Sequence, residues 1–460
     1  MNVAIDFAPD LLRKYDRPGP RYTSYPTAVQ FHEQFGLEDY LREVEAGNRK
    51  GTPLSLYFHL PFCAQVCFYC GCNKIVTANR ARAQPYLDRL YREMALQADL
   101  FDSQRPVEQL HWGGGTPTFI SDEQMRELIR VSRELFVFLP DDQGEYSVEI
   151  DPREAGPDTI GLLRELGFNR LSLGVQDVDI EVQRAVNRVQ PLDVTEDCIR
   201  AAREQQFRSI SLDLIYGLPK QTAESFDRTL DVVIDLDADR LSVFNYAHLP
   251  ELFKVQRQIN ADDLPSPAVK LKILQRTIQR LTDAGYVYIG MDHFAKPDDE
   301  LALAQQQGTL QRNFQGYSTC ADSDLIGLGI TSIGHVGDSY SQNLKTLDAY
   351  YSCVDKHQLP LWRGVKLNHD DRLRRAVITQ LICQFELNFT AIEDAFDIRF
   401  SEYFQAELQE MEKLALDGLV DLHIDRIRVC PAGRLLIRNI CMVFDRYLSQ
   451  AQSQRFSRAI

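Results

Sequence analysis

Between about residues 54 and 250 the chain alternates short apolar runs with longer amphipathic stretches. This alternation is typical of βα units, whose strands form a parallel sheet. Six such units can form a closed barrel, an incomplete barrel or an open doubly wound sheet, and periodicity alone fits all three. The predicted strands span Leu54–Leu60, Gln109–Trp112, Tyr146–Ile150, Arg170–Val175, Ser209–Ile215 and Arg240–Asn245. The predicted helices span Gln84–Ala98, Asp122–Leu135, Pro157–Leu166, Val194–Glu204 and Ala223–Val233.

Polar side chains fall near the C-terminal ends of these predicted strands. Glu149, Gln176, Asp213 and Asn245 interrupt or end otherwise apolar runs. A strand that is buried on both faces is normally apolar throughout. Barrels of βα units place their active sites at the C-terminal ends of the strands. We therefore expect a ligand site at this end of the sheet.

The segments that flank the alternating region have a different character. Residues 1–50 contain a turn-rich stretch whose Tyr22 and Tyr25 either close over a reacting centre or pack as an ordinary cap. A helix is expected from about Leu37 to Val44, and residues 251–345 are interpreted as helices and loops.

A second helical region begins near residue 365. A helix over Asp371–Gln384, two further helices and short apolar strands near Leu419–Val429 predict a winged-helix arrangement. Acidic and basic residues are nearly balanced there, whereas a domain that reads DNA should be basic. A structural or substrate-covering role is the better expectation.

Composition limits the partners of the chain. Its 460 residues carry a formal net charge of −15, whereas nucleic-acid or anionic-membrane binding needs a basic face. The first residues lack the basic and apolar regions of a signal peptide, and the longest uncharged stretch, residues 51–73, contains two prolines and four cysteines. We therefore expect a cytoplasmic protein that binds neither nucleic acid nor membrane. Any anionic substrate would need basic residues gathered locally.

Four of the ten cysteines, Cys63, Cys67, Cys70 and Cys72, lie within ten residues. In a chain without a secretion signal, such a cluster predicts metal or cofactor binding rather than disulfides. Directly after the first strand, the first three can hold three irons of a [4Fe–4S] cube and leave the fourth iron open to a ligand. With Cys72 as a fourth ligand, the site would instead be closed zinc or a plain electron-transfer cluster, and the spacing leaves this open.

A glycine-rich turn, Gly113–Thr118, follows the second predicted strand. Glycines let the backbone approach a ligand closely. The turn lacks the lysine of a phosphate-binding P-loop and the spacing of a dinucleotide fingerprint. Alone it would be weak evidence, but beside a three-cysteine loop it indicates a shared ligand site.

These two motifs together resemble the radical S-adenosylmethionine (SAM) superfamily. Longer segments resemble the oxygen-independent coproporphyrinogen III oxidases of bacterial haem synthesis, from about Tyr15 to the C-terminus; among them are GPRYTSYPTA, HLPFC, CGCNKIVT, HWGGGTPT, EIDPRE, GFNRLSLGVQD and DLIYGLPKQT. The resemblance implies an α/β fold: an incomplete (β/α)6 radical-SAM barrel with an N-terminal arm and a mainly helical C-terminal domain. We place the arm at residues 1–50, the barrel and its extension at 51–345, and the winged-helix-like domain at 346–460.

The resemblance also implies the site residues. Cys63, Cys67 and Cys70 would ligate a [4Fe–4S] cluster, and the family is similar in binding two SAM molecules. The first SAM would contact Tyr57, Gly114, Glu149 and Ile333, although TSIGHVGD departs from the expected pattern around Ile333. The second would contact Tyr69, Gly115, Thr116, Gln176, Arg188, Asp213 and Ala247. Arg188 can pair with a SAM carboxylate as a bidentate fork.

The implied reaction is the oxidative decarboxylation of two propionates of coproporphyrinogen III to vinyl groups by a SAM-derived 5′-deoxyadenosyl radical, giving protoporphyrinogen IX. A low-potential donor such as a flavodoxin or ferredoxin would supply electrons, and we expect a monomer. Arg21 and Arg312 are candidates for holding substrate carboxylates. The alternatives are a haem-binding chaperone on the same scaffold and a zinc-stabilised α/β protein.

Overall fold

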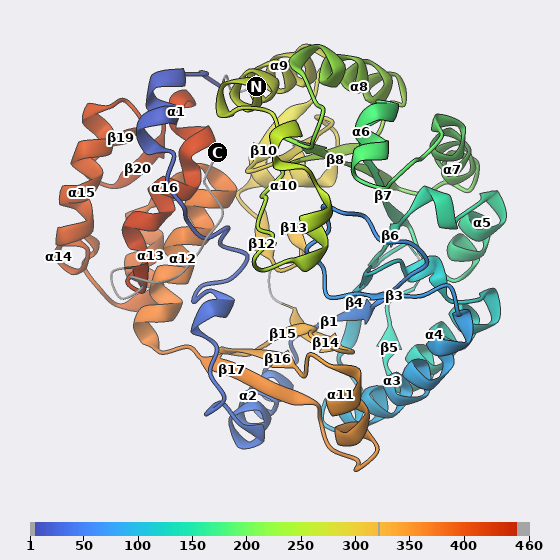
Figure 1. Cartoon of the computed structure of the whole chain (residues 1–460). Helices are drawn as coiled ribbons and strands as arrows, with labels where there is room; N and C mark the ends of the chain where they lie inside the picture. The colour runs from blue at the N-terminus through green and yellow to red at the C-terminus, as the bar shows by residue number, and fades with distance from the viewer. Residues whose placement is uncertain (1–4, 141, 321–322, 449–460) are drawn as a thin grey trace. The chain divides into compact units, whose positions relative to one another are not determined.

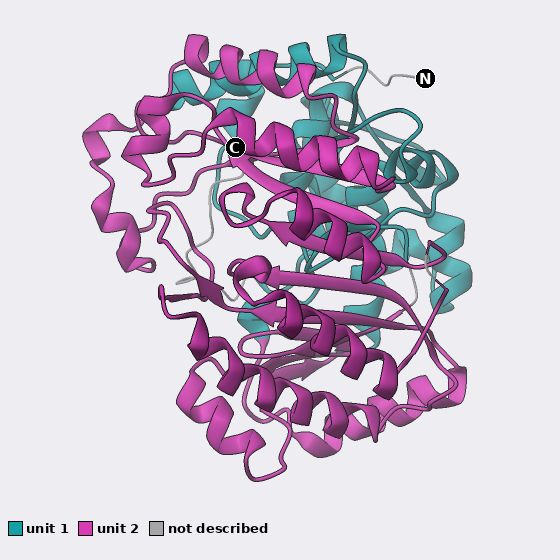
Figure 2. Cartoon of the chain, turned by 90° about the vertical axis from the view of Figure 1, so that its right-hand side faces the viewer, with its two compact units in different colours: residues 1–30, 267–321, 367–460 teal, residues 31–266, 322–366 magenta. Residues whose placement is uncertain are grey.

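The computed structural model describes residues 5–140, 142–320 and 323–448. They divide into two compact units, which Figure 2 shows in separate colours. Unit 1 is made from residues 1–30, 267–321 and 367–460, and unit 2 from residues 31–266 and 322–366. Among the described residues, no helix is both long and apolar enough to cross a membrane.

Unit 2 is built on six parallel strands in the order β9-β8-β7-β6-β4-β1. The alternation of the sequence predicts all six strands, and each observed strand lies within three residues of its predicted bounds. The short strand β5 pairs in parallel with the start of β4. The strands are β1 (Leu54–Leu60), β4 (Pro106–Gly114), β5 (Val137–Phe138), β6 (Glu145–Ile150), β7 (Arg170–Gln176), β8 (Ser209–Tyr216) and β9 (Arg240–Asn245).

Helices connect these strands and lie outside them, as Figure 1 shows. They form because apolar residues recur on one face, and a polar side chain caps the start of α4, α6 and α8. Helix α4 shows both features, with Met125, Leu128 and Ile129 buried and Ser121 forming a capping box with Gln124. The connecting helices are α3 (Ala83–Ala98), α4 (Asp122–Leu135), α5 (Pro157–Glu165), α6 (Ile180–Ala185), α7 (Leu192–Glu204) and α8 (Ala223–Asp235).

Beyond β1 the sheet of unit 2 continues through a second group of strands, in the order β14-β15-β16-β17. Strand β14 pairs in parallel with β1, and the other three pairings are antiparallel. The bounds are β14 (Asp324–Leu328), β15 (Ile333–Val336), β16 (Ser339–Asn343) and β17 (Leu361–Lys366), with α2 (Leu37–Lys50) and α11 (Leu347–Val354) in the same unit.

The interpretation of residues 251–345 as helices and loops is wrong for this part of the chain. Strands β14 to β16 are only four or five residues long, and Gly327 and Gly334 interrupt their apolar pattern. A Cβ at Gly327 would lie 2.8 Å from the backbone of Ile333, so the glycine allows β14 and β15 to approach closely. Such close approach is a usual reason for glycine inside a strand.

Unit 1 is mainly helical. Its helices are α1 (Pro9–Tyr15), α9 (Pro267–Asp283), α10 (Glu300–Gln307), α12 (His369–Gln384), α13 (Phe389–Phe396), α14 (Phe400–Tyr403), α15 (Gln405–Leu416) and α16 (Ile437–Cys441). Strands β10 (Val287–Gly290) and β11 (His293–Ala295) form one hairpin, and β12 (Gln311–Asn313) and β13 (Gly316–Ser318) form another. A three-stranded antiparallel sheet has the order β18-β20-β19, from β18 (Glu386–Asn388), β20 (Arg426–Val429) and β19 (Val420–Leu422).

The remaining short elements are 3-10 turns and one strand pair. The turns are η1 (Ala28–Gln30), η2 (Arg80–Arg82), η3 (Pro117–Phe119), η4 (Pro152–Glu154), η5 (Lys254–Gln258), η6 (Ala261–Asp263), η7 (Pro431–Leu436) and η8 (Met442–Phe444). Strands β2 (Phe62–Cys63) and β3 (Ile75–Val76) pair in parallel.

The first part of the N-terminal arm, up to Gln30, belongs to unit 1, and the rest of it belongs to unit 2. Tyr22 and Tyr25 are only 4% and 1% exposed. The Tyr22 hydroxyl donates to Asp445 at 3.0 Å, and the Tyr25 hydroxyl accepts from the backbone N–H of Arg446 at 3.2 Å. Of the two alternatives for these tyrosines, the structure therefore shows packing against the C-terminal segment of the same unit.

Candidate functional site

The cysteine motif lies on a loop whose two ends are joined at its base. Strand β2 pairs with β3, so that Phe62 is opposite Ile75 and Cys63 is opposite Val76. The N–H of Ile75 donates to the carbonyl of Pro61 at 2.7 Å. This short pair closes the loop directly after β1 and brings both of its ends to the C-terminal edge of the sheet.

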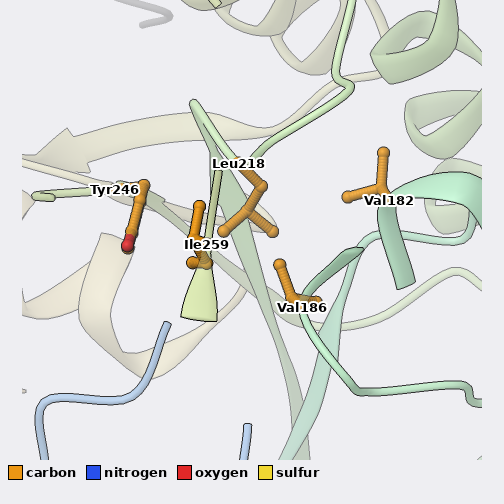
Figure 3. Close-up of a cluster of buried hydrophobic side chains, with 5 residues drawn as sticks. All are labelled: Val182, Val186, Leu218, Tyr246 and Ile259. Carbon is orange, nitrogen blue, oxygen red and sulfur yellow. The ribbon is translucent and has the colours of Figure 1, made fainter. Parts of the chain in front are cut away.

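A hydrophobic cluster supports the middle of the loop. Figure 3 shows its five buried side chains, Val182, Val186, Leu218, Tyr246 and Ile259. Phe68 and Tyr69, between the second and third cysteines of the motif, pack against this cluster. The N–H of Phe68 also donates to the carbonyl of Val186 at 2.9 Å. Because both apolar packing and a backbone hydrogen bond fix Phe68, the thiols on either side have defined positions.

Gly113 and Gly114, the last two residues of β4, have neighbours that leave no room for a side chain. A Cβ at Gly113 would lie 2.9 Å from the carboxyl carbon of Glu149. A Cβ at Gly114 would lie 2.7 Å from the His59 ring. Gly114 also has a φ of +111°, which side-chain-bearing residues rarely adopt. In this conformation the N–H of Gly114 donates to Glu149 Oε2 at 3.1 Å.

The third glycine touches the backbone that leads into the cysteine loop. A Cβ at Gly115 would lie 2.6 Å from both the carbonyl carbon of Pro61 and the carbonyl oxygen of Phe62. The N–H of Gly115 donates to Leu60 at 2.8 Å, and that of Thr116 donates to Phe62 at 2.7 Å. These hydrogen bonds hold the glycine turn and the cysteine loop in contact, as a shared ligand site requires.

One pocket of about 330 Å³ opens at these two segments. It is lined by the four clustered cysteines and by eight of the residues predicted to contact SAM. Those eight are Tyr69, Gly114, Gly115, Thr116, Glu149, Gln176, Arg188 and Asp213. All lie in unit 2, at the loops and C-terminal ends of β1, β4, β6, β7 and β8, as the polar strand ends predict.

The thiols of the loop are unpaired and have contrasting environments. None of the described cysteines forms a disulfide. Burial raises the pKa of the Cys63 thiol to about 11, whereas a hydrogen bond with Cys72, helped by the charge of Lys74, lowers that of Cys70 to about 5. The Thr116 hydroxyl donates to the Cys63 sulfur at 3.6 Å.

The donor set suits an iron–sulfur cluster. In the described segments, no three His, Cys, Asp or Glu side chains converge as ligands of one metal ion. Cys63, Cys67 and Cys70 all face the same pocket, and thiolates are the usual ligands of such cubes.

Glu149 is held in place by two hydrogen bonds on one side. Its Oε1 accepts from His111 Nε2 at 3.2 Å and its Oε2 accepts from Gly114, while the side chain remains 46% exposed. His111 Nδ1 lies 2.6 Å from the Ser147 hydroxyl oxygen. Burial acts to raise the pKa of Glu149, but the hydrogen bonds and the charge of His111 hold it below its usual range. Glu149 is therefore a fixed carboxylate that can accept further hydrogen bonds.

Arg188 joins the cysteine loop to the strand ends. Its guanidinium donates to Asp151 and to the Gly174 carbonyl, both at 2.7 Å, and to the Cys67 sulfur at 3.6 Å. Arg153 also contacts Asp151 at 2.7 Å and the Cys67 sulfur at 3.7 Å. Two cations thus lie beside one thiol, the Cys67 sulfur.

Asp213 provides a second carboxyl in the pocket. It accepts from the Ser172 hydroxyl at 2.9 Å. Burial raises the pKa of Asp213 to about 6, and the charge of Glu149 acts in the same direction. Asp213 therefore takes up a proton at a higher pH than Glu149, although both line the same pocket.

Three predicted SAM contacts do not line the pocket. Tyr57 stacks on His111 with the ring centroids 5.8 Å apart, and its hydroxyl contacts His59 at 3.2 Å. Ile333 is half-buried at the start of β15. The Ala247 carbonyl accepts from Gln256 at 3.3 Å, and the same amide donates to Tyr69 at 3.0 Å. The roles of these three residues stay predictions.

The sequence reasoning missed Asp151 and Arg153, which organise the Arg188 side of the pocket. Both directly follow β6, and Asp151 comes two residues after Glu149. Polar residues at the C-terminal end of a predicted strand indicate a ligand site, which is how Glu149 was predicted. The same reasoning could have identified Asp151 and Arg153. The substrate candidates Arg21 and Arg312 lie in unit 1, where Arg21 pairs with Asp292 at 2.6 Å and Arg312 lies over the ring of Tyr317.

Comparison with known proteins identifies relatives along the whole chain. Residues 57–233 match the family model of the radical SAM superfamily, and residues 367–436 match that of the HemN C-terminal domain. An oxygen-independent coproporphyrinogen III oxidase from Pseudomonas aeruginosa is 58% identical over 451 residues, which is 98% of each chain. The enzyme of that name from Escherichia coli is 53% identical over 457 residues, 99% of each chain.

A solved structure shows the same fold. The structure of E. coli coproporphyrinogen III oxidase, described as a radical SAM enzyme, has a TM-score of 0.92 and 52% identity. It matches 96% of this chain and all of that one. The predicted fold class is thereby confirmed, and a radical SAM enzyme implies a [4Fe–4S] cluster and SAM. The chain belongs to the oxygen-independent coproporphyrinogen III oxidase family of radical SAM enzymes.

Proposed function

We propose that this chain converts two propionates of coproporphyrinogen III into vinyl groups without oxygen, giving protoporphyrinogen IX in haem biosynthesis. The single observation that carries the proposal is the pocket in which a three-cysteine loop, a glycine turn and the carboxyl groups of Glu149, Asp151 and Asp213 meet. Relatives that match almost the whole chain bear the name of this activity, which favours it over a haem-binding chaperone or a zinc-stabilised protein.

The chemistry requires a radical and an electron acceptor. Each propionate loses one hydrogen atom from its β-carbon, then releases CO2 and one electron as the vinyl group forms. When bound, the cluster and SAM supply the radical that removes the hydrogen atom. The residues of this chain hold those groups, orient them and limit access to the pocket.

We assign Cys63, Cys67 and Cys70 as the cluster ligands and Cys72 as a neighbour that does not bind iron. The hydrogen bonds from Thr116 to Cys63 and from Arg153 and Arg188 to Cys67 support this assignment. Hydrogen bonds to ligand sulfurs are a means by which proteins set the potential of such clusters.

We further propose that two SAM molecules bind. Tyr57, Gly114, Glu149 and Ile333 would contact the first. Glu149 presents a fixed carboxylate, suited to an amino group or ribose hydroxyls. The second would contact Tyr69, Gly115, Thr116, Gln176, Arg188, Asp213 and Ala247. Asp213 supplies the acceptor there, and Arg188 has a buried Nε without a partner among the described residues.

The proposed partners follow from the same chemistry. A low-potential donor such as a flavodoxin or ferredoxin would deliver electrons, and the chain would act as a monomer. We place it in the cytoplasm, where a reducing environment keeps thiols from forming disulfides; no disulfide joins the cysteines that the structure describes.

The proposal is tested with anaerobically reconstituted protein, coproporphyrinogen III, SAM and a reductant. We expect CO2 and divinyl product, and two SAM bound per chain at saturation. Cys63→Ser should abolish the visible absorption of the cluster, whereas Cys353→Ser, which changes a thiol of α11 outside the loop, should retain it. No vinyl product from a protein with a full cluster would refute the activity, and saturation at one SAM would remove the second site.

A further inference from the structure

Residues that are opposite one another on neighbouring strands form a row across the sheet of unit 2, from Tyr57 on β1 to Arg363 on β17. Tyr57 pairs with Gly327, and Ile333 pairs with Gln342, which in turn pairs with Arg363. The close approach of Gly327 to Ile333 joins the two halves of this row. Strands β14 to β17 lie side by side in Figure 1. Because paired residues share one face of a sheet, Arg363 lies on the face of Tyr57 and Ile333, two predicted SAM contacts.

Two cations flank one indole at this end of the row. The Lys345 Nζ lies 4.2 Å from the ring centroid of Trp362, and the guanidinium carbon of Arg363 lies 4.3 Å from it. Arg363 Nε donates to Gln342 at 2.8 Å, and the indole N–H donates to Glu33 at 3.0 Å. The cation–π contacts and hydrogen bonds hold both charges in place.

These cations have no carboxylate partner. Across the part of the chain that the structure describes, no Asp or Glu oxygen lies within ion-pair distance of Lys345 or Arg363. Burial lowers the pKa of both, and Arg363 lowers that of Lys345 further, while the charge of Glu33 acts on Arg363 in the opposite direction. An anion bound close to both like charges would relieve their repulsion.

A second contact ties this cation pair to the cysteine loop. The side-chain amide of Asn73, one residue after Cys72, donates to the Lys345 carbonyl at 3.1 Å and to Thr331 at 3.3 Å. The Asn73 carbonyl accepts from His59 Nε2 at 2.9 Å. The pair therefore lies at the border of the loop that would hold the cluster.

We propose that Lys345 and Arg363 bind a propionate carboxylate of the tetrapyrrole substrate. This inference rests on the proposed function and names residues for substrate recognition. Among the described residues, the hydrogen bond of the Arg363 guanidinium is made by Nε, so its terminal nitrogens can form a fork around a carboxylate, which an ammonium group cannot do alone. The chain has a net charge of −15, which repels an anionic substrate, and a local pair of cations offsets this repulsion at the binding site.

The test measures binding of coproporphyrin III, the fluorescent oxidised form of the substrate, to anaerobically reconstituted full-length protein. Arg363→Gln and Lys345→Gln should each raise its dissociation constant about tenfold, as expected for loss of a charge-assisted hydrogen bond. Arg363→Lys should recover part of the affinity. Arg89→Gln is the matched control: Arg89 also stacks on an aromatic ring, that of Tyr351, but it is already paired with Asp355.

The outcomes separate this inference from the proposed function. Unchanged porphyrin affinity in both variants, with cluster absorption intact, would overturn the inference. So would a loss confined to SAM or to the electron-donor protein. If the wild-type protein binds coproporphyrin through these residues but forms no vinyl product, the carboxylate site stands and the activity fails.

Discussion

Gly115 shows how one residue can couple the two halves of the cofactor site. Its missing side chain lets the glycine turn rest on the backbone of Pro61 and Phe62, which leads into the cysteine loop. Gly115→Ala should therefore lower the free energy of unfolding by about 1–3 kcal/mol, because the clash is with backbone. It should also weaken SAM binding. Chemical denaturation and equilibrium dialysis would measure the two effects.

The control is another glycine of the same unit. A Cβ at Gly161, within α5, has no heavy atom within 4 Å. Gly161→Ala should be neutral or stabilise by up to about 1 kcal/mol, since alanine favours helix. Equal destabilisation by both substitutions would contradict the role of close packing at Gly115.

At the residue level, the sequence shows which residues belong to the pocket better than it shows how they are oriented. Glu149 and Asp213 could be predicted because each interrupts an apolar strand. Asp151 was missed although it lies only two residues after Glu149, because its role depends on Arg188, which is distant in the sequence. The side-chain contacts of Arg188 with Asp151 and Gly174 depend on tertiary packing that periodicity does not encode.

At the scale of elements, a buried carboxyl on α3 holds the turn after β14. Glu93 is fully buried and accepts from the Gly329 N–H at 2.8 Å, from Asn343 at 2.6 Å and from the Tyr350 hydroxyl at 2.5 Å. Burial raises its pKa to about 7, although these hydrogen bonds act in the opposite direction. One side chain thus joins α3, β16, α11 and the turn that leads to β15.

The raised pKa of Glu93 predicts a pH-dependent stability. Between the ordinary carboxyl pKa and about 7, the folded state keeps a proton that the unfolded state has lost. Stability from Glu93 is therefore full at low pH and decreases as the pH rises through 7. From pH 5 to pH 8 the free energy of unfolding of the wild-type protein should fall by about 2–3 kcal/mol more than that of Glu93→Gln. Chemical denaturation at several pH values would check this, with the exposed Glu134→Gln as control; parallel pH profiles for wild type and Glu93→Gln would contradict it.

The parallel strands could be predicted because each is a continuous apolar run between helices. Strands β14, β15 and β16 could not, because they are short and carry Gly327, Gly334 and several polar side chains. Their strand structure comes from pairing with neighbours, such as Leu325 with both Ser55 and His335. That information lies in the fold rather than in the local sequence.

At the scale of the whole molecule, each unit is assembled from segments that are far apart in the sequence. Unit 1 joins the first part of the N-terminal arm, up to Gln30, to residues more than 400 positions later, through pairs such as Tyr22 and Asp445. The domain boundaries at residues 50 and 345 stay a prediction. Local composition marks the arm as unusual, but it does not show that the arm belongs with the C-terminal segment.

Arg438 is the residue on which this joining of the two ends can be tested. It is buried, and its guanidinium donates to the carbonyl of Pro20 at 3.1 Å and to that of Gly19. Arg438→Met keeps much of the side-chain volume but leaves both carbonyls without their charged donor, so the arm should detach before the rest of unit 1 unfolds. We expect a loss of about 2–4 kcal/mol in the free energy of unfolding and rapid proteolysis within residues 5–30. Mass spectrometry after limited trypsin digestion would locate the cuts.

Arg426→Met, which removes a half-exposed partner of the adjacent Asp425, should change neither result. If the arm of Arg438→Met resists trypsin as well as that of the wild type does, the arm is held by its tyrosines and not by this arginine.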